Sequence, residues 1–295
     1  MGKHAYMIMV HEQPQLLKKL LSALDHKRND IFLHIDLKSS IDGMDISGIC
    51  RYSNVYLTER ICVFWGGYSQ IRAELILLKT ALKTGCYDYY HLLTGVDFPL
   101  LSQEEILQYF DNNEGKEFIS LTKCPCIERV KFYYPFQDKF NRHHFIGIVL
   151  RKIGVSLQTL FQIDRTKKCS LKWGYGSAYF DITDDVARYI CSQEKLIQSI
   201  FKDTFCADEI FLQTIYLNSP FFESKKRNKS IKKHPHINDL SLDINRAIDF
   251  SRGNPYTYKI DDLKELCESG CFFARKCDYE KYPELIDALE KRILK

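Results

Sequence analysis

Apolar and polar positions alternate between strand-like and helix-like patterns along the first third of the 295-residue chain. Residues 4–10 and 31–35 are continuous apolar runs, as expected of strands that are buried on both faces. Between them, residues 14–24 carry leucines at helical spacing after a proline suited to a first helical turn. Such βαβ alternation predicts a mostly parallel sheet flanked by helices, with ligand sites at the carboxyl ends of its strands.

Strand-like and helix-like stretches continue beyond residue 40. Runs rich in β-branched and aromatic residues occupy three further segments: residues 54–57, 87–94 and 177–182. A helical stretch leads from the loop around Trp65 to about Lys83. Thr183 has the position of an N-cap for a helix through Cys191. We therefore expect one α/β domain that covers residues 1–295, without internal repeats or linkers.

Composition agrees with a globular protein and excludes several classes. The net charge of +4 is too small, and the Lys and Arg residues too evenly spread, for a nucleic-acid-binding protein. The eleven cysteines are odd in number and scattered, and no secretory signal precedes them, so we expect free thiols and a cytoplasmic location. Nothing in the composition indicates an oligomeric state.

Residues 173–209 contain several candidate catalytic and binding residues. Gly174 and Gly176 flank Tyr175, so we expect a backbone free to adopt positive φ and to pass close to a ligand. The same stretch ends with Asp208 and Glu209 at the start of an apolar helix. The helix dipole alone explains two acids at that position, and for the isolated pair this is the simpler interpretation.

The longer sequence pattern around Asp208 and Glu209 favours a catalytic role over the helix-dipole interpretation. The order of a GSAYF strand, a helix, about two dozen further residues and an acidic DE resembles the core-2/I-branching N-acetylglucosaminyltransferase and peptide xylosyltransferase family (glycosyltransferase family 14). Three other motifs carry the resemblance: HIDLKS at 34–39, WGGYS at 65–69 and GVDFPL at 95–100, of which the last is the most specific. The resemblance covers nearly the whole chain and suggests a bacterial-type member.

The resemblance implies a GT-A-like (Rossmann-like) fold and an inverting transfer of a UDP-linked sugar, such as GlcNAc or xylose, to a saccharide hydroxyl in surface polysaccharide synthesis. Glu209 falls on the catalytic base of the family. Donor-binding residues would be His11, Asp36, Trp65, Asp97, Arg246, Arg275 and Lys276. Acceptor-binding residues would be Glu117, Arg129, Trp173, Tyr175, Ser177 and Asp208. A strand-end Asp such as Asp36 is also a common turn residue.

The expected donor site differs from other GT-A enzymes in its metal chemistry. Those enzymes usually have an Asp-x-Asp where this chain has only Asp97. A lone carboxylate does not supply the paired oxygen ligands that Mg²⁺ or Mn²⁺ takes beside a diphosphate. We expect no metal cofactor, and the resemblance implies that Arg246 and Lys276 stabilise the departing diphosphate instead. A solvated surface cluster is the alternative interpretation of these cations.

Two other functions are compatible with the same residues. A nucleotide-sugar-binding protein could keep the fold without turnover, and a nucleotide-sugar hydrolase would use the same base on water. The presence of Glu209 together with Arg246 and Lys276 favours an enzyme, because a binding protein needs no base.

A second stretch of interest is residues 145–163, where apolar residues recur at helical spacing in the most basic part of the chain. The surrounding cations are Lys139, Arg142, Arg151, Lys152, Arg165, Lys167, Lys168 and Lys172. Basic amphipathic helices adsorb to anionic membranes. One interpretation is a peripheral contact with the inner face of the membrane, suited to a lipid-linked acceptor. The other is a helix packed on the core with a solvated basic face.

Overall fold

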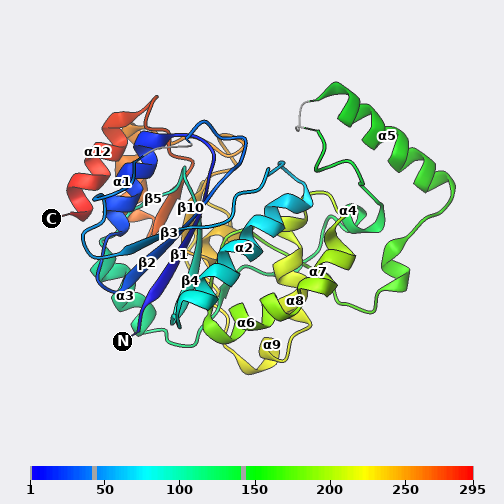
Figure 1. Ribbon diagram of the computed structural model, residues 1–295, viewed down its shortest axis with the longest axis horizontal. Coiled ribbons are helices and arrows are strands. Elements are labelled where there is room, and N and C mark those ends of the chain that lie inside the picture. Colours follow the sequence, from blue (N-terminus) through cyan, green and yellow to red (C-terminus); the bar gives the residue numbers. More distant parts are fainter. Residues whose placement is uncertain (1, 42–44, 141–143, 295) are drawn as a thin grey trace.

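The computed structural model describes residues 2–41, 45–140 and 144–294, and its centre is a six-stranded sheet with helices on both faces (Figure 1). The strand order is β3-β2-β1-β4-β9-β6. Four strands are parallel: β1 (His4–Val10), β2 (Asn29–Ile35), β3 (Asn54–Leu57) and β4 (Tyr89–Thr94). The sheet is completed by β9 (Phe180–Thr183), which pairs antiparallel with β4, and by β6 (Phe118–Ile119), which pairs antiparallel with β9. The predicted mostly parallel α/β sheet is confirmed.

Successive side chains of the parallel strands pack into two different cores. On β1, Ala5 and Met7 pack into one core, whereas Tyr6 and Ile8 pack into the other. The first core is formed with α2 (Tyr68–Thr84), α6 (Asp184–Ser192), α7 (Glu194–Phe201) and α8 (Phe211–Leu217). The second is formed with α1 (Pro14–Leu24) and α3 (Gln103–Asp111). Burial on both faces explains why these strands are continuous apolar runs rather than alternating ones.

Smaller elements extend the body around the carboxyl end of β4. One small sheet has the order β10-β11-β5, with β10 (Arg246–Ile248), β11 (Phe273–Arg275) and β5 (Phe98–Pro99). Another pairs β7 (Thr122–Lys123) with β8 (Gly174–Tyr175). The remaining helices are α4 (Glu128–Lys131), α5 (Phe145–Leu160), α9 (Phe221–Ser224), α10 (Asp239–Asp243), α11 (Leu263–Glu268) and α12 (Pro283–Ile293).

The segment around β8 and β9 differs from the sequence-based expectation in two ways. The strand expected at 177–182 begins only at Phe180, because Ser177 N donates a hydrogen bond to Ser120 Oγ instead of joining the sheet. The prediction that Gly174 and Gly176 provide positive φ is wrong. At Gly176 a Cβ atom would lie 2.1 Å from the Ser120 carbonyl oxygen, so glycine is required there by close packing.

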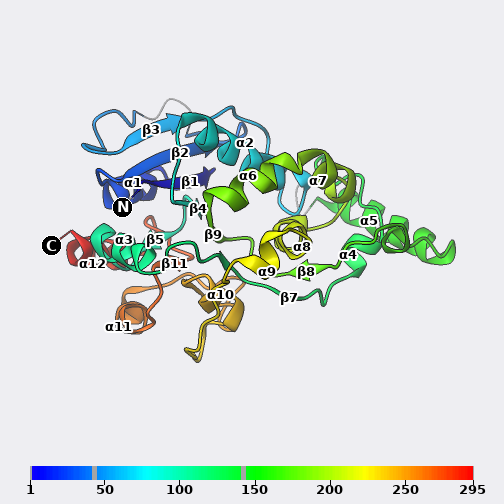
Figure 2. The same cartoon turned by 90° about the horizontal axis from the view of Figure 1, so that it is seen from below.

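Helix α5 forms where the apolar spacing predicts it and extends from the body at the end opposite to α12 (Figures 1 and 2). Every residue of α5 is described, and none is buried. The alternative of a helix packed on the core is therefore wrong. Arg142 and the side chain of Lys168, both counted in the basic neighbourhood, lie outside what the structure describes. Within the described residues, no helix combines the length and the apolar character needed to cross a membrane.

Candidate active site

A cavity of about 790 Å³ lies at the carboxyl ends of β1, β2 and β4, where the parallel strands were expected to place a ligand. Its volume is in the range of small-molecule sites. The cavity wall includes eight of the residues predicted from the sequence: His11, Asp36, Trp65, Tyr175, Ser177, Asp208, Glu209 and Arg275. Segments from the two ends of the chain therefore meet at one site.

Glu209 ends a short 3₁₀ turn just before α8. Its backbone carbonyl accepts a hydrogen bond from Gly176 N at 3.0 Å, which holds the turn against β8. Its Oε2 lies 2.5 Å from Arg129 Nη1, and the two side chains are 33% and 28% exposed. Arg129 thus contacts the carboxylate instead of forming part of the cavity wall. Because partly exposed ion pairs are weak, a hydroxyl group of a ligand can compete for this carboxylate.

Tyr175 lies beside this carboxylate in the cavity wall. Burial, followed by the negative charge of Glu209, raises the pKa of Tyr175 to about 12. The phenol is therefore neutral at physiological pH and keeps its proton to donate in a hydrogen bond. Ser177, two residues further, accepts a hydrogen bond from Tyr179 N through its Oγ at 3.3 Å. The 175–177 segment thus contributes two hydroxyl-bearing residues, Tyr175 and Ser177, to the cavity wall.

Two further carboxyl groups face the same region. Desolvation, followed by the negative charge of Glu209, raises the pKa of Asp208 to about 7. Gln70 Nε2 donates to Asp208 Oδ2 at 3.3 Å. Glu74 of α2 is 1% exposed, and within the described residues its carboxyl oxygens have no hydrogen-bond partner. Burial, followed by the charge of Asp208, holds the pKa of Glu74 well above its usual value, which favours the protonated carboxyl.

Arg275 supplies a fixed cation in the cavity wall. Its Nη1 donates to Thr94 Oγ1 and to Asp97 Oδ1, the latter at 3.3 Å, and its guanidinium lies 5.0 Å from the Tyr179 ring centroid. Although desolvation opposes the charge, Tyr179 and Asp97 raise the pKa of Arg275. The other carboxyl oxygen of Asp97 accepts from Thr94 N at 2.6 Å. Asp97 therefore positions Arg275. Although Asp97 was predicted to bind the donor, it is not among the residues of the cavity wall.

The edge expected to hold the nucleoside is built from a turn and a loop. Asp36 Oδ1 accepts from Lys38 N at 2.9 Å, so Asp36 is a turn residue and also part of the cavity wall. Lys38 Nζ lies 3.9 Å from the Phe64 ring centroid and is a further cation of the wall. Trp65 is 46% exposed and packs edge-on against another aromatic ring, Phe205, at 5.8 Å. A flat ring and a carboxylate are thus offered to the cavity.

Comparison with known proteins identifies the family of the chain. The family model described as Core-2/I-Branching enzyme matches residues 4–266. The chain belongs to the core-2/I-branching enzyme family. Human xylosyltransferase 2 is 29% identical over 298 residues, which cover 97% of this chain and 33% of that protein. A zebrafish (Danio rerio) beta-1,3-galactosyl-O-glycosyl-glycoprotein beta-1,6-N-acetylglucosaminyltransferase 4 is 22% identical over 307 residues, which cover 98% of this chain and 69% of that protein.

Rat (Rattus norvegicus) xylosyltransferase 2 is 23% identical over 298 residues, which cover 97% of this chain and 33% of that protein. The chain thus spans about a third of the length of these xylosyltransferases.

Arg246, expected to contact the diphosphate in a core-2/I-branching enzyme, is instead buried away from the cavity. Its side chain is 1% exposed, and its Nη2 lies 2.6 Å from Asp181 Oδ1. The same carboxylate lies 2.8 Å from His91 Nδ1, and the guanidinium packs over the Phe273 ring at 4.7 Å. A cation paired in this way is committed to the core. The prediction for Arg246 is therefore wrong.

Two predicted acceptor residues are also placed elsewhere. Glu117 is fully buried, and its carboxylate accepts hydrogen bonds from Thr183 N at 3.0 Å and from Thr183 Oγ1. Lys225 Nζ lies 3.5 Å from it. This carboxylate joins β6 to β9 and does not face the cavity. Trp173 packs against the first core, with its ring 6.3 Å from that of Phe201, so it is a core residue.

Lys276 lies next to the cavity without forming part of its wall. Its Nζ lies 3.4 Å from Oε1 of Glu12, which is a cavity-wall residue. Its predicted contact with the diphosphate stays a prediction.

Sequence reasoning missed Glu74, Gln70 and Lys38. Glu74 had a detectable signal: it falls on the apolar stripe of α2, three residues after Ile71 and one before Leu75. A carboxyl group on a buried face needs an explanation. Lys38 lay inside a motif that carried the family resemblance, but its side chain was assigned no role.

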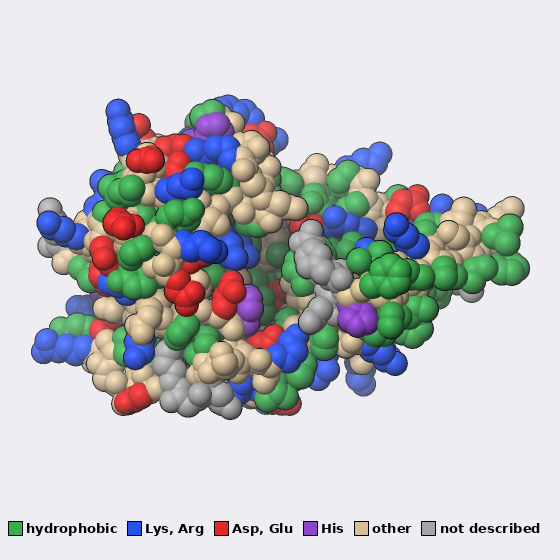
Figure 3. All heavy atoms as spheres, turned by 90° about the horizontal axis from the view of Figure 1, so that it is seen from above, with side chains coloured by type: hydrophobic (Ala, Val, Ile, Leu, Met, Phe, Trp, Pro, Cys, Tyr) green, Lys and Arg blue, Asp and Glu red, His purple; other side chains and the backbone are tan. Residues whose placement is uncertain are grey.

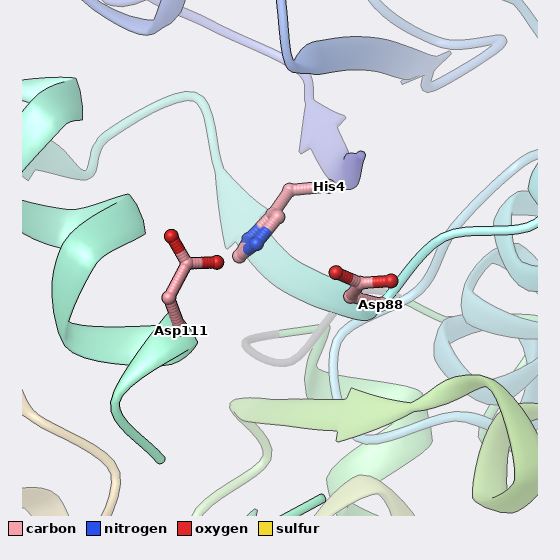
Figure 4. Close-up of side chains that lie close together, drawn as sticks. All are labelled: His4, Asp88 and Asp111. Atoms are coloured by element: carbon pink, nitrogen blue, oxygen red, sulfur yellow. The ribbon is translucent and has the colours of Figure 1, made fainter. Parts of the chain in front are cut away.

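A group of possible metal ligands, His4, Asp88 and Asp111, lies at the opposite ends of the strands (Figure 4). His4 Nδ1 shares a hydrogen bond with His91 Nε2 at 2.8 Å. Both oxygens of Asp111 accept from Arg28, at 2.9 and 2.6 Å, and Asp88 accepts from the Gly2 amide at 2.7 Å. Because the carboxylates are already occupied by donors, the group does not fit a metal ion.

Proposed function

We propose that the protein is an inverting glycosyltransferase that moves a sugar from a UDP-sugar to a hydroxyl group of a saccharide acceptor. The observation that carries the proposal is the single cavity in which the carboxylate of Glu209 and the guanidinium of Arg275 both form part of the wall. Membership of the core-2/I-branching family, and relatives named for xylosyl and N-acetylglucosaminyl transfer, support sugar transfer as the reaction class.

The reaction is one in-line displacement. The acceptor oxygen forms a bond to the anomeric carbon of the donor while the bond from that carbon to the diphosphate oxygen breaks. The electron pair of the broken bond leaves with the nucleoside diphosphate, and the proton of the acceptor hydroxyl passes to the Glu209 carboxylate. Arg275, fixed by Thr94 and Asp97, stabilises the charge that develops on the leaving group.

The surrounding residues divide between donor and acceptor. Asp36 and Trp65 bind the uridine and ribose at the edge formed by the ends of β1 and β2. Tyr175 and Ser177 offer hydroxyl groups to the acceptor sugar beside the base. Lipid-linked glycans of surface polysaccharide synthesis, made on the cytoplasmic side, are the acceptors that we propose.

The proposed reaction uses no divalent cation. The carboxylate at the position of the usual metal ligands, Asp97, is occupied by Thr94 and Arg275, so it does not offer free oxygens to Mg²⁺ or Mn²⁺. Arg275 supplies the positive charge instead. Product formation should therefore persist in excess chelator, and turnover that requires added Mn²⁺ would contradict this part of the proposal.

The test compares Glu209→Gln with the wild-type protein in assays of a UDP-sugar panel with and without saccharide acceptors. Gln keeps the shape but accepts no proton, so turnover should fall by about 10² to 10⁴ while donor affinity is retained. The matched control is Glu128→Gln, since Glu128 is 62% exposed and pairs only loosely with Lys131 at 3.8 Å. Its activity should equal that of the wild type.

Product analysis separates the alternatives. A disaccharide or longer product supports the transferase. Release of free sugar at the same rate without acceptor would identify a hydrolase, and donor binding without any product would identify a binding protein.

A further inference from the structure

Helix α5 exposes an apolar stripe that the fold leaves uncovered. Six of its large apolar side chains are from 36% to 76% exposed: Phe145, Ile146, Leu150, Ile153, Leu157 and Leu160. Most of them recur at intervals of three and four residues, so they share one side of the helix. Figure 3 shows hydrophobic side chains gathered at this end of the molecule, with Lys and Arg side chains around them.

The contacts that attach α5 to the body use its other side. Gly147 approaches Phe140 so closely that a Cβ atom would lie 2.8 Å from the Phe140 Cβ. The Arg151 guanidinium lies 4.8 Å from the Phe205 ring centroid, and Gln158 donates to the Tyr133 carbonyl at 3.0 Å. The side of the helix that faces the body therefore carries these three residues and the half-buried Ile148. The apolar stripe is left for something outside the chain.

Along the α5 segment itself the charges are of one sign, and Asp138 and Asp164 lie at its borders. Residues 139–163 contain no Asp or Glu. Lys139, Lys152, Lys167 and Lys172 are exposed on or near the helix. In a symmetric pair of chains, the same cations would be brought together and would repel one another. Anionic lipid headgroups would neutralise them while the apolar side chains enter the acyl boundary.

We propose that α5 is a membrane-docking helix that lies in the interface of an anionic bilayer. Its 16 residues span about 24 Å at about 1.5 Å per residue. The exposed stripe inserts below the headgroups, and the lysines contact lipid phosphates. This docking does not depend on the transferase proposal, because binding is measured without any sugar substrate.

The experiment is cosedimentation of the full chain with vesicles of phosphatidylcholine alone or of phosphatidylcholine mixed with phosphatidylglycerol. We expect binding to the anionic vesicles that decreases as salt rises, because the electrostatic part is screened. The variant Ile153→Ser/Leu157→Ser removes two side chains that are 52% and 50% exposed, and should bind at least about tenfold more weakly. Because these side chains are exposed, the variant should unfold at the wild-type temperature.

The matched control is Ile260→Ser/Leu294→Ser, which changes the same residue types at 43% and 56% exposure elsewhere on the surface. It should bind as the wild type does. Equal binding by the α5 variant, or failure of the wild type to sediment with anionic vesicles, would overturn the proposal. A wild-type dimer in solution that the α5 variant loses, without vesicle binding, would assign the stripe to a second copy of the chain.

Discussion

At the scale of single residues, Arg246 and Arg275 show that a cation on an apolar strand can lie either in the core or at the cavity, depending on its aspartate partner. They belong to the neighbouring parallel strands β10 and β11, and each contacts one aspartate. Arg246 meets Asp181 inside the body and is 1% exposed, whereas Arg275 meets Asp97 at the cavity wall and is 22% exposed. Only the second can reach a ligand, so the two should differ sharply when replaced.

We expect Arg275→Ala to weaken binding of UDP by about tenfold or more while binding of uridine hardly changes, because the lost cation serves the phosphates. Arg246→Ala should instead lower the free energy of unfolding by about 3 to 5 kcal/mol, because it removes the cation that compensates the buried charge of Asp181, although the contact of Asp181 with His91 remains. Titration calorimetry and thermal unfolding measure the two effects. Retained stability in Arg246→Ala together with weakened UDP binding would show that the structural assignment is wrong.

The sequence patterns identified which residues are candidates for the site, but they did not reveal which partners surround each residue in the fold. Glu209 was assigned from its match to the catalytic base of the family, and Arg275 from its position after an apolar strand-like stretch. Both lie in the cavity wall. Arg246 has the same local signal as Arg275. What separates them is the partner, Asp181 on a distant strand, which local periodicity does not reveal.

At the scale of elements, the long segments were predictable and the short ones were not. The bounds of β1 and α1 agree with their apolar patterns, because each buries a regular set of side chains. The bounds of β3 also agree with the prediction, although its residues are half-buried or exposed. The two-residue strands β5 and β6 carry no period to detect. Their positions depend on pairing with β11 and β9, which lie far along the chain.

The β8 segment offers a test of close packing at this scale. Gly176→Ala would place a methyl group 2.1 Å from the Ser120 carbonyl oxygen, so the backbone must shift. Such overpacking typically costs about 1 to 3 kcal/mol of stability. Because Gly176 N also bonds the Glu209 carbonyl, the shift should lower kcat by more than the stability loss would suggest. Activity assays and thermal unfolding measure both.

Gly154→Ala is the control for that substitution. Nothing lies within 4 Å of its added Cβ, and the residue is inside α5, so stability should stay equal or rise by up to about 1 kcal/mol. Wild-type activity and stability in Gly176→Ala would mean that β8 and the Ser120 segment do not pack as described.

At the scale of the whole molecule, the two cores and the cavity share the same strands. Alternate residues of β1 supply both cores, and the end of the strand reaches the cavity wall at Val10 and His11. Helix α2 likewise packs on the sheet while it places Gln70 and Glu74 at the cavity. Ionisable groups of the site are thus embedded in the folding core, and their protonation must affect global stability.

Glu74 makes this coupling measurable. Its pKa is raised in the folded state, so between its unfolded value and its folded value the native protein holds a proton that the unfolded chain has lost. The contribution of Glu74 to the free energy of unfolding is therefore largest at low pH. It decreases as pH rises, by at most about 1.4 kcal/mol per pH unit. Asp208, whose pKa is raised to about 7, acts in the same direction.

Glu74→Gln replaces the protonated carboxyl with a neutral group of similar shape, so its stability should equal that of the wild type near pH 5. Between pH 5 and pH 8 the melting temperature of the wild type should fall relative to the variant, by about 2 to 4 °C for each kcal/mol. Comparing the two proteins cancels the buried histidines His4 and His91, whose lowered pKa values give the opposite slope. Glu128→Gln, at an exposed position, should follow the wild type at every pH. Parallel curves for wild type and Glu74→Gln would show that Glu74 is ionised or solvated in the native protein, and the description of its carboxyl as a buried, neutral group would then be wrong.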